Sequence, residues 1–325
     1  MDSNLTAKQK NVLALSRKVI DEIKKVVIGK DDIIIKVMLS ILAGGHILIE
    51  DIPGVGKTTL ALAFSRALSL DYKRLQFTPD VLPSDVTGFT ILNRQTHEFE
   101  YKEGSAMTNL FLADEINRTS PKTQSALLEV MEEGKVTVDG ISYKTPDPYI
   151  VIATQNPLGS IGTQSLPESQ LDRFIVRLTM GYPTKQSEVL MLKAKQNMIS
   201  VEEIQPVISK EELINAKKEV EGIYVSDAIF EYIASLSETT RNNEYIKLGL
   251  SPRGSIALLK MTKATALFSG RNYALPDDVL YAFNDVVSHR LIFGSRAKMN
   301  GLSEKNILSQ IISSVAVPNA RNTKV

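Results

Sequence analysis

An apolar run at His46–Glu50 leads directly into a turn with two glycines, Asp51–Gly56, and then into a stretch with helical apolar spacing, Thr58–Ser69. A strand, a tight glycine loop and a helix start in this order constrain the fold strongly. The glycines let backbone N–H groups converge in front of the helix, whose N-terminus adds its positive dipole end. The segment therefore predicts a phosphate-binding P-loop rather than an ordinary glycine-rich turn.

The residue types in this loop indicate how a nucleotide is held. Gly54 and Gly56 supply the turned backbone, the Lys57 ammonium suits the β- and γ-phosphates, and the Thr58 hydroxyl suits Mg²⁺. One position departs from the general pattern, which begins with glycine where this chain has Asp51. Because that position lies at the strand exit, farther from the phosphates than the later glycines, we expect the loop to form.

Two adjacent carboxylates, Asp114 and Glu115, follow a second apolar run at Asn109–Ala113. An ATPase needs a metal-binding carboxylate and a group beside the attacking water, whereas a phosphotransferase needs a base near its acceptor. We expect Asp114 to hold Mg²⁺ through water and Glu115 to orient and polarise the attacking water. A strand end with two solvated acids is the alternative, which the upstream P-loop disfavours.

Three further polar residues occupy positions that such a hydrolase needs. Asn156 comes just after the apolar run Tyr149–Thr154 and is suited to hold water or contact the γ-phosphate. Arg173 precedes the run Phe174–Thr179, and Arg253 opens a helical stretch. Arginines supply planar charge to transition-state oxygens, in cis or from a neighbouring subunit. A surface salt bridge is the competing interpretation for each arginine.

The pattern of the chain changes near residue 181 and predicts two domains. Before that point, candidate strands alternate with helical stretches, and most of these strands are continuous apolar runs, which is typical of a parallel α/β sheet covered on both faces. The candidate strands are His46–Glu50, Tyr72–Phe77, Asn109–Ala113, Tyr149–Thr154 and Phe174–Thr179. After it, helical stretches follow one another without a convincing strand: Lys185–Asn197, Lys210–Val220, Ser226–Arg241, Pro252–Ser269, Pro276–His289 and Ser303–Ser314. We expect an α/β core over residues 1–181 and an all-helical domain over residues 182–325.

Composition narrows the chemistry and the partners. The chain has 38 basic and 37 acidic side chains, which argues against electrostatic binding of nucleic acid. It has no cysteine, which excludes disulfides, thiolate catalysis and Cys-ligated zinc and suits a reducing cytosol. Its polar N-terminus is no signal peptide, and polar residues interrupt the longest apolar stretch, Ile33–Ile49. We therefore expect a cytoplasmic protein without a membrane span.

The ordered motifs resemble those of the AAA+ ATPases and, more closely, those of the MoxR family. The resemblance covers nearly the whole chain, from about Val27 to Pro318, and includes Asp51 at the start of the P-loop. The matching runs are IEDIPGVGKT, RLQFTPDVLPSDVTG, LADEINRTSPKTQSALLEVMEEGKVTVDG, ATQNP, LPESQLDRF and MGYPT, with GLSPRG, LPDDV and VVSHRL in the helical domain. The resemblance implies an AAA+ core with a helical lid, and ATP and Mg²⁺ as its ligands.

Residue roles follow from the same resemblance. Lys57 and Thr58 match the Walker A lysine and Mg²⁺ ligand, Asp114 the Walker B aspartate, Glu115 the catalytic glutamate and Asn156 sensor 1. Arg253 matches sensor 2, which reaches from the lid to the γ-phosphate. Arg173 matches the arginine finger offered to the adjacent subunit, with Arg118 and Arg177 as alternatives. The remaining nucleotide contacts fall on Val27, Ile28, Gly29, Pro53, Gly54, Val55, Gly56 and Thr59.

Two insertions match as well. Residues 85–104, Asp85–Gly104, resemble the helix-2 insert that such proteins project toward a central pore. Residues 134–148, Gly134–Pro148, resemble the pre-sensor 1 hairpin, and their Asp139-Gly140 pair predicts a two-residue hairpin turn. Plain connecting structure is the alternative for both.

The family resemblance implies a ring-forming, Mg²⁺-dependent ATPase with its hydrolysis sites between subunits. A hexamer is the expected ring, with a trimer or a spiral as alternatives. It further implies chaperone-like remodelling of protein clients, often with a partner that carries a von Willebrand factor A domain. Two other functions use the same motifs. One is a DNA-acting AAA+ motor, which the balanced charge and the lack of an appended DNA-binding domain disfavour. The other is a nucleotide-gated scaffold with little turnover, which the complete catalytic set disfavours.

Overall fold

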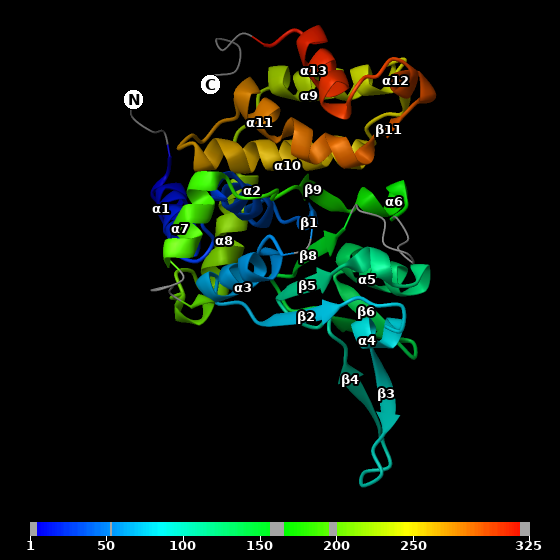
Figure 1. Ribbon diagram of the computed structural model, residues 1–325. Coiled ribbons are helices and arrows are strands. Elements are labelled where there is room, and N and C mark those ends of the chain that lie inside the picture. Colours follow the sequence, from blue (N-terminus) through cyan, green and yellow to red (C-terminus); the bar gives the residue numbers. More distant parts are fainter. Residues whose placement is uncertain (1–4, 53, 157–165, 195–199, 319–325) are drawn as a thin grey trace.

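A five-stranded parallel sheet forms the centre of the protein (Figure 1). The computed structural model describes residues 5–52, 54–156, 166–194 and 200–318. The strand order is β2-β5-β8-β1-β9, and the strands are β1 (His46–Glu50), β2 (Tyr72–Gln76), β5 (Leu110–Asp114), β8 (Ile150–Gln155) and β9 (Phe174–Leu178). All neighbouring pairs in this sheet are parallel. The predicted α/β core with a five-stranded parallel sheet is therefore confirmed.

The two faces of the sheet contribute to separate hydrophobic clusters. In β1, Ile47 and Ile49 join the cluster on one face, and Leu48 joins the cluster on the other. Successive strand residues point to opposite faces, so a strand covered on both sides needs an unbroken apolar run. Helices α1 (Ala7–Lys24), α2 (Asp31–Leu42) and α3 (Lys57–Ala67) contribute to the first cluster, and α5 (Pro121–Glu133) contributes to the second.

Helices α1 and α2 are not among the predicted elements. Helix α1 starts with a capping box, in which Thr6 Oγ1 accepts the Gln9 N–H at 3.2 Å and Gln9 Oε1 accepts the Thr6 N–H at 3.0 Å. Helix α2 is buried along most of its length. Its charged residues Asp31, Asp32 and Lys36 lie in its first half, and the rest of the helix is almost continuously apolar, so the sequence resembles a plain apolar stretch.

Two antiparallel hairpins extend from the core. After the short helix α4 (Pro83–Thr87), strands β3 (Gly88–Leu92) and β4 (Phe99–Glu103) form a ribbon that projects away from the sheet (Figure 1). The second hairpin pairs β6 (Lys135–Val138) with β7 (Ile141–Lys144).

The hairpin turns and side chains fit this arrangement. Asp139 and Gly140 have φ values of 49° and 80°, as a two-residue hairpin turn of this kind requires. The rings of Tyr101 and Tyr143 stack with centroids 3.9 Å apart, so the two hairpins contact each other.

The part of the chain after Gly181 is mainly helical, as predicted. In the described residues of this part, the α-helices are α7 (Lys185–Ala194), α8 (Lys210–Glu221), α9 (Asp227–Arg241), α10 (Pro252–Phe268), α11 (Pro276–Val287), α12 (Ser295–Met299) and α13 (Glu304–Ser314). One detail differs: β10 (Ile246–Leu248) pairs antiparallel with β11 (Ile292–Phe293). These strands are too short to show an alternating pattern in the sequence. The predicted helix end at Asn197 lies outside the described residues.

No helix in the described part of the chain is both long and apolar enough to cross a bilayer.

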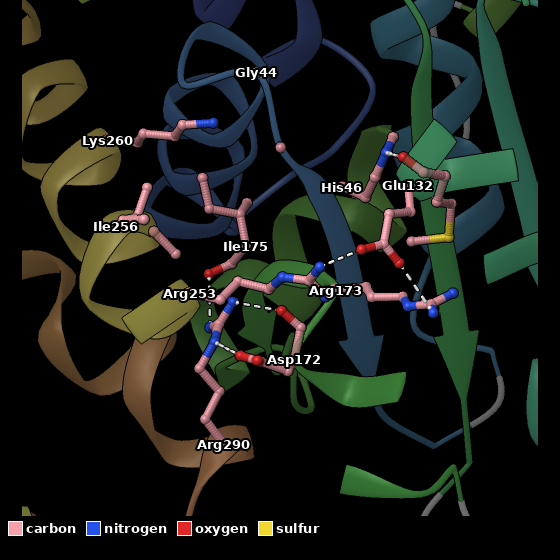
Figure 2. Close-up of a pocket in the computed structure, with 13 residues that line it drawn as sticks. Gly44, His46, Glu132, Asp172, Arg173, Ile175, Arg253, Ile256, Lys260 and Arg290 are labelled. Carbon is pink, nitrogen blue, oxygen red and sulfur yellow. Dashed lines mark hydrogen bonds and ion pairs between the residues drawn. The ribbon is translucent and has the colours of Figure 1, made fainter. Parts of the chain in front are cut away.

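A buried arginine attaches the helical lid to the sheet (Figure 2). Arg290 follows α11, and its side chain is 2% exposed. Its guanidinium donates to Asp172 Oδ1 at 2.7 Å and to the carbonyl oxygen of Phe174 at 2.6 Å. The other oxygen of Asp172 accepts the hydroxyl of Ser251, the N-cap of α10, at 2.9 Å. Asp172 and Arg290 thus connect the start of β9 with two lid helices.

We expect Arg290→Ala to lower the free energy of unfolding by about 3 kcal/mol, because it breaks a buried ion pair. This value is at the low end for such a change, since the remaining partner, Asp172, keeps some contact with water. Urea denaturation followed by circular dichroism measures the change. Arg296→Ala is the control, since that side chain is 70% exposed and its ion pair with Glu244 is expected to contribute less than about 0.5 kcal/mol. Equal losses in the two variants would contradict the anchoring role.

Candidate active site

The predicted P-loop turns through two left-handed glycines. Gly54 has a φ of 83° and Gly56 a φ of 94°, a region that glycine adopts without steric cost. Apart from the adjacent loop residues, no atom of the residues that the structure describes lies within 4 Å of a Cβ built at either position, so this side of the loop backbone is open. Gly56 is the N-cap of α3, and Thr58 and Thr59 lie in the first helical turn. Pro53, also predicted to contact nucleotide, lies outside the described residues.

A cavity of about 360 Å³ lies beside this loop, with mainly apolar walls. Its lining includes the predicted nucleotide contacts Val27, Ile28, Gly54, Val55, Gly56 and Thr59, together with Val26, Lys30, Tyr182, Pro183 and Met191. Apolar walls for a base next to an open glycine loop for phosphates fit a nucleotide. Gly29 is not in the lining; it packs on α7, where an added Cβ would lie 2.5 Å from Ser187 Cβ.

The Lys57 ammonium is held close to the loop. Its Nζ donates to the carbonyl oxygens of Asp51 at 2.9 Å and Ile52 at 3.0 Å. Burial lowers the pKa of Lys57, and the charges of Asp51, Asp114 and Glu115 oppose that shift. A partly desolvated cation at this position is suited to bind phosphate oxygens strongly.

Asp51 connects the P-loop to the junction between core and lid. Its carboxylate is buried and accepts the N–H of Ile52 at 2.7 Å and the N–H of Gly181. Gly181 has a φ of 62°, and its carbonyl oxygen accepts a bond from Lys30 Nζ at 2.8 Å. At this position an aspartate takes the place of the usual glycine, and its side chain holds the segment at Gly181 against the P-loop.

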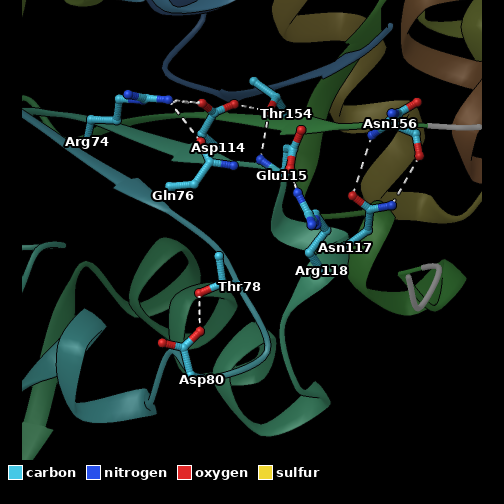
Figure 3. Close-up of polar contacts among 10 residues, drawn as sticks. All are labelled: Arg74, Gln76, Thr78, Asp80, Asp114, Glu115, Asn117, Arg118, Thr154 and Asn156. Carbon is cyan, nitrogen blue, oxygen red and sulfur yellow. Dashed lines mark hydrogen bonds and ion pairs between the residues drawn. The ribbon is translucent and has the colours of Figure 1, made fainter. Parts of the chain in front are cut away.

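The two adjacent carboxylates lie at the carboxyl-terminal edge of the sheet (Figure 3). Asp114 ends β5 and is buried; its Oδ1 accepts the Thr154 hydroxyl at 2.7 Å, and its Oδ2 accepts Arg74 Nη2 at 2.7 Å. Glu115 Oε2 pairs with Arg118 Nη1 at 2.6 Å. Because β1 also ends at this edge, Thr58 and Asp114, the predicted Mg²⁺ ligands, approach from the same side of the sheet.

Asn156 follows β8 at the same edge. Its backbone pairs with the side chain of Asn117: Asn117 Nδ2 donates to the Asn156 carbonyl at 3.1 Å, and the Asn156 N–H donates to Asn117 Oδ1 at 3.4 Å. Asn117, Thr154 and Arg74 were not predicted as parts of the site. The signal for Thr154 is a polar side chain in an otherwise apolar strand. Arg74 lies in a strand with several polar residues, so no such signal marks it.

Arg173 and Arg253 meet at the opposite edge of the sheet (Figure 2). Both pair with Glu132 near the end of α5, Arg173 Nη2 at 2.9 Å. They line a cavity of about 220 Å³ with the residues that begin or precede β1 and β9, including Gly44, Gly45, His46 and Asp172. Since the strands are parallel, this amino-terminal edge lies away from the P-loop. Within one chain, Arg253 therefore does not reach the phosphate end of that loop in this arrangement.

The two alternative finger arginines have partners in their own chain. Arg177, in β9, pairs with Glu50 at 3.3 Å and with Glu304 of α13 at 2.8 Å, and its side chain is 23% exposed. Arg118 pairs with Glu115 beside the P-loop edge. Only Arg173, of the three candidates, lies at the edge that faces away from the chain's own P-loop.

Comparisons with known proteins agree with this architecture. Residues 46–176 match the ATPase family associated with various cellular activities (AAA), and residues 238–311 match the AAA lid domain. The uncharacterized protein YeaC of Bacillus subtilis is 48% identical over 316 residues, covering 97% of this chain and 99% of YeaC. Chaperone MoxR1 of Mycobacterium tuberculosis is 33% identical over 306 residues, covering 91% of this chain and 81% of MoxR1.

A solved structure extends the similarity to the whole fold. The crystal structure of a protein from Cytophaga hutchinsonii, provisionally assigned as an ATPase, superimposes with a TM-score of 0.89 at 36% identity. The match covers 96% of this chain and 97% of that one. With its P-loop, paired carboxylates and helical lid, the chain belongs to the MoxR family of AAA+ ATPases.

Proposed function

We propose that this protein hydrolyses ATP to ADP and phosphate at the interfaces of a homo-oligomeric ring. One observation carries the proposal: a single chain presents the P-loop and carboxylates at one edge of its sheet and the Arg173–Arg253 pair at the other. A head-to-tail contact brings opposite edges of neighbouring copies together, and such contacts form rings when the rotation closes. A hexamer is the closed form we propose.

The described residues divide the chemistry between them. The loop backbone at Gly54 and Gly56 and the Lys57 ammonium bind the phosphates, and the cavity beside Val27 and Ile28 takes the base. Thr58 and Asp114 would hold Mg²⁺, which supplies charge neutralisation for the transferring phosphoryl group. Glu115 orients the attacking water and polarises it. Asn156, fixed by Asn117, places an amide beside the γ-phosphate.

The neighbouring subunit completes the site. Arg173 and Arg253 both pair with Glu132, and their side chains are 27% and 47% exposed, so each can exchange that carboxylate for a phosphate oxygen of the adjacent copy. In this proposal sensor 2, like the arginine finger, acts in trans. ATP then connects two subunits, and its hydrolysis releases the contact on which their relative positions depend.

We further propose that the ring remodels protein clients. We also propose that the α/β core ends near residue 181 and that the helical lid follows it. The projecting β3–β4 hairpin, in the place of the helix-2 insert, carries exposed apolar side chains: Phe89 is 50% exposed, Leu92 51% and Phe99 77%. Exposed apolar groups of this kind suit contact with unfolded or extended protein segments. The proposed partner with a von Willebrand factor A domain rests on the family resemblance. The proposed cytoplasmic location rests on the lack of cysteine, which suits a reducing compartment.

Steady-state ATP turnover tests this function directly. We expect ATP hydrolysis that depends on Mg²⁺ and stops when EDTA removes the metal. Duplex or single-stranded DNA should change the turnover rate by less than about twofold, because the chain has no basic excess. Strong stimulation by DNA, with steep salt dependence, would favour a DNA-acting motor. An assembled ring that binds ATP with negligible turnover would favour the scaffold.

A further inference from the structure

The hydroxyl of Thr154 contacts both carboxylate residues of the site (Figure 3). Thr154 lies in β8 and is fully buried. Its Oγ1 is 2.7 Å from Asp114 Oδ1 and 2.8 Å from the Glu115 backbone nitrogen. A carboxylate only accepts and a backbone N–H only donates, so the hydroxyl donates to Asp114 and accepts from Glu115. One oxygen atom thus fixes the side chain of one residue and the backbone of the next.

The backbone of Glu115 needs such a contact. Its φ of 57° and ψ of 50° lie in the left-handed region, which residues other than glycine seldom adopt. Such a backbone conformation persists only where the surrounding structure holds it. Two bonds hold it here: the Glu115 N–H to Thr154, and the Arg118 N–H to the Glu115 carbonyl at 2.9 Å. The left-handed residue turns the chain off β5, and this turn sets the direction of the glutamate side chain.

Strand register places Thr154 where it can do this. In the β5–β8 pairing, Ala113 lies opposite Ala153. The residues that come next, Asp114 in β5 and Thr154 in β8, are therefore neighbours. On its other side β8 pairs with β1, where Thr154 lies opposite Ile49, just before the P-loop. The hydroxyl is therefore between the strand that carries the carboxylates and the strand that leads to the phosphate loop.

We infer that Thr154 is a positioning residue that sets the metal-binding carboxylate and the water-orienting glutamate together. This inference rests on the proposed ATP hydrolysis. Thr154 does not touch the nucleotide in this scheme; it acts through Asp114 and Glu115. Arg74 holds the other oxygen of Asp114, and a carboxylate has acceptor sites left for a hydrated metal after these bonds. Loss of the hydroxyl frees the Asp114 side chain on one side and leaves the Glu115 N–H unpaired.

The test compares Thr154→Val, which replaces the hydroxyl by a methyl group, with Thr154→Ser, which keeps it. For Thr154→Val we expect kcat to fall by about 10- to 100-fold, which is the usual cost of removing a group that orients a metal ligand. The Mg²⁺ concentration that gives half-maximal binding of a fluorescent ATP analogue should rise by at least about fivefold. Binding of the analogue in EDTA should stay within about twofold, because the glycine loop and Lys57 are intact. Thr154→Ser should stay within about threefold of the wild type in every measurement.

A buried threonine elsewhere controls for packing. Thr262 in α10 is fully buried, and its hydroxyl donates to the Leu258 carbonyl at 2.8 Å, so Thr262→Val removes a similar bond far from the carboxylates. It should leave the Mg²⁺ dependence unchanged. If Thr154→Val does not fold, Thr154→Ala removes the same hydroxyl without adding a methyl group and takes the same measurements.

Two results would overturn the inference: a Thr154→Val variant with wild-type Mg²⁺ dependence and kcat, or a Thr154→Ser variant as impaired as Thr154→Val. Failure of the proposed function looks different. A wild-type protein that binds the analogue without turnover contradicts ATP hydrolysis, while the Mg²⁺ dependence of binding in the two variants still decides the role of Thr154.

Discussion

Replacing Glu115 by glutamine is expected to lower steady-state ATP turnover by at least about 10²-fold while leaving ATP binding within about threefold of the wild type. Glutamine has nearly the same size and the same backbone requirements, so the bond from its N–H to Thr154 can still form. It lacks the negative charge that, in the proposed mechanism, orients and polarises the attacking water. Binding depends on the glycine loop and Lys57, which the substitution does not touch.

Turnover is measured by phosphate release and binding by titration of a fluorescent ATP analogue. Glu244→Gln makes the same chemical change on the lid surface, where that side chain is 59% exposed, and should behave like the wild type. Turnover of Glu115→Gln that matches the wild type would exclude Glu115 as the catalytic glutamate. A parallel loss of binding would show instead that the substitution damages the site as a whole.

Arg173→Ala is expected to lower turnover by at least about 10²-fold, because arginine fingers contribute to kcat through the charge they place on transition-state oxygens. Since Arg173 lies at the edge away from its own P-loop, the lost charge belongs to the neighbour's site in the proposed ring. Nucleotide binding should change much less. Arg253→Ala is expected to act in the same direction, and Arg296→Ala, on the exposed lid surface, should leave turnover unchanged.

Mixed rings separate an arginine that acts in trans from one that acts in cis. When subunits with Arg173→Ala exchange with subunits carrying Glu115→Gln, about a quarter of the interfaces in a random head-to-tail ring combine an intact P-loop edge with an intact arginine edge. Turnover should therefore exceed that of either variant alone. A mixture of Lys57→Ala with Glu115→Gln, which damages the same edge twice, should stay inactive. Recovery in both mixtures or in neither would contradict the proposed interface.

The strands of the sheet could be predicted because their burial is visible in short runs of sequence. Ile47, Leu48 and Ile49 alternate between two hydrophobic clusters, so every position in the run must be apolar. Helix α2 is also largely apolar, and its charged residues lie in its first half, so that most of its length resembles a plain apolar stretch. The pairing of β10 with β11 could not be predicted, since strands of three and two residues carry no pattern.

The P-loop edge of the site was also accessible from the sequence. Lys57 follows β1 through the P-loop, Asp114 ends β5 and Asn156 comes directly after β8. The carboxyl ends of these parallel strands share one edge of the sheet. Their supporting residues were not accessible, because Thr154 and Asn117 contact these groups across strands or turns. The reason for an aspartate instead of glycine at position 51 lies in the tertiary structure, where the Asp51 carboxylate accepts the Gly181 N–H.

By itself, the sequence determined the strand–loop–helix at His46–Ser69, the five sheet strands, the helical lid and the family, because each depends on local residue order and burial period. Only the tertiary structure decided which edge each arginine occupies, which partners hold Asp114 and Glu115, and how the lid is anchored through Arg290. These features join residues far apart in the chain. They follow from strand register and from the docking of the lid on the sheet, which no local pattern encodes.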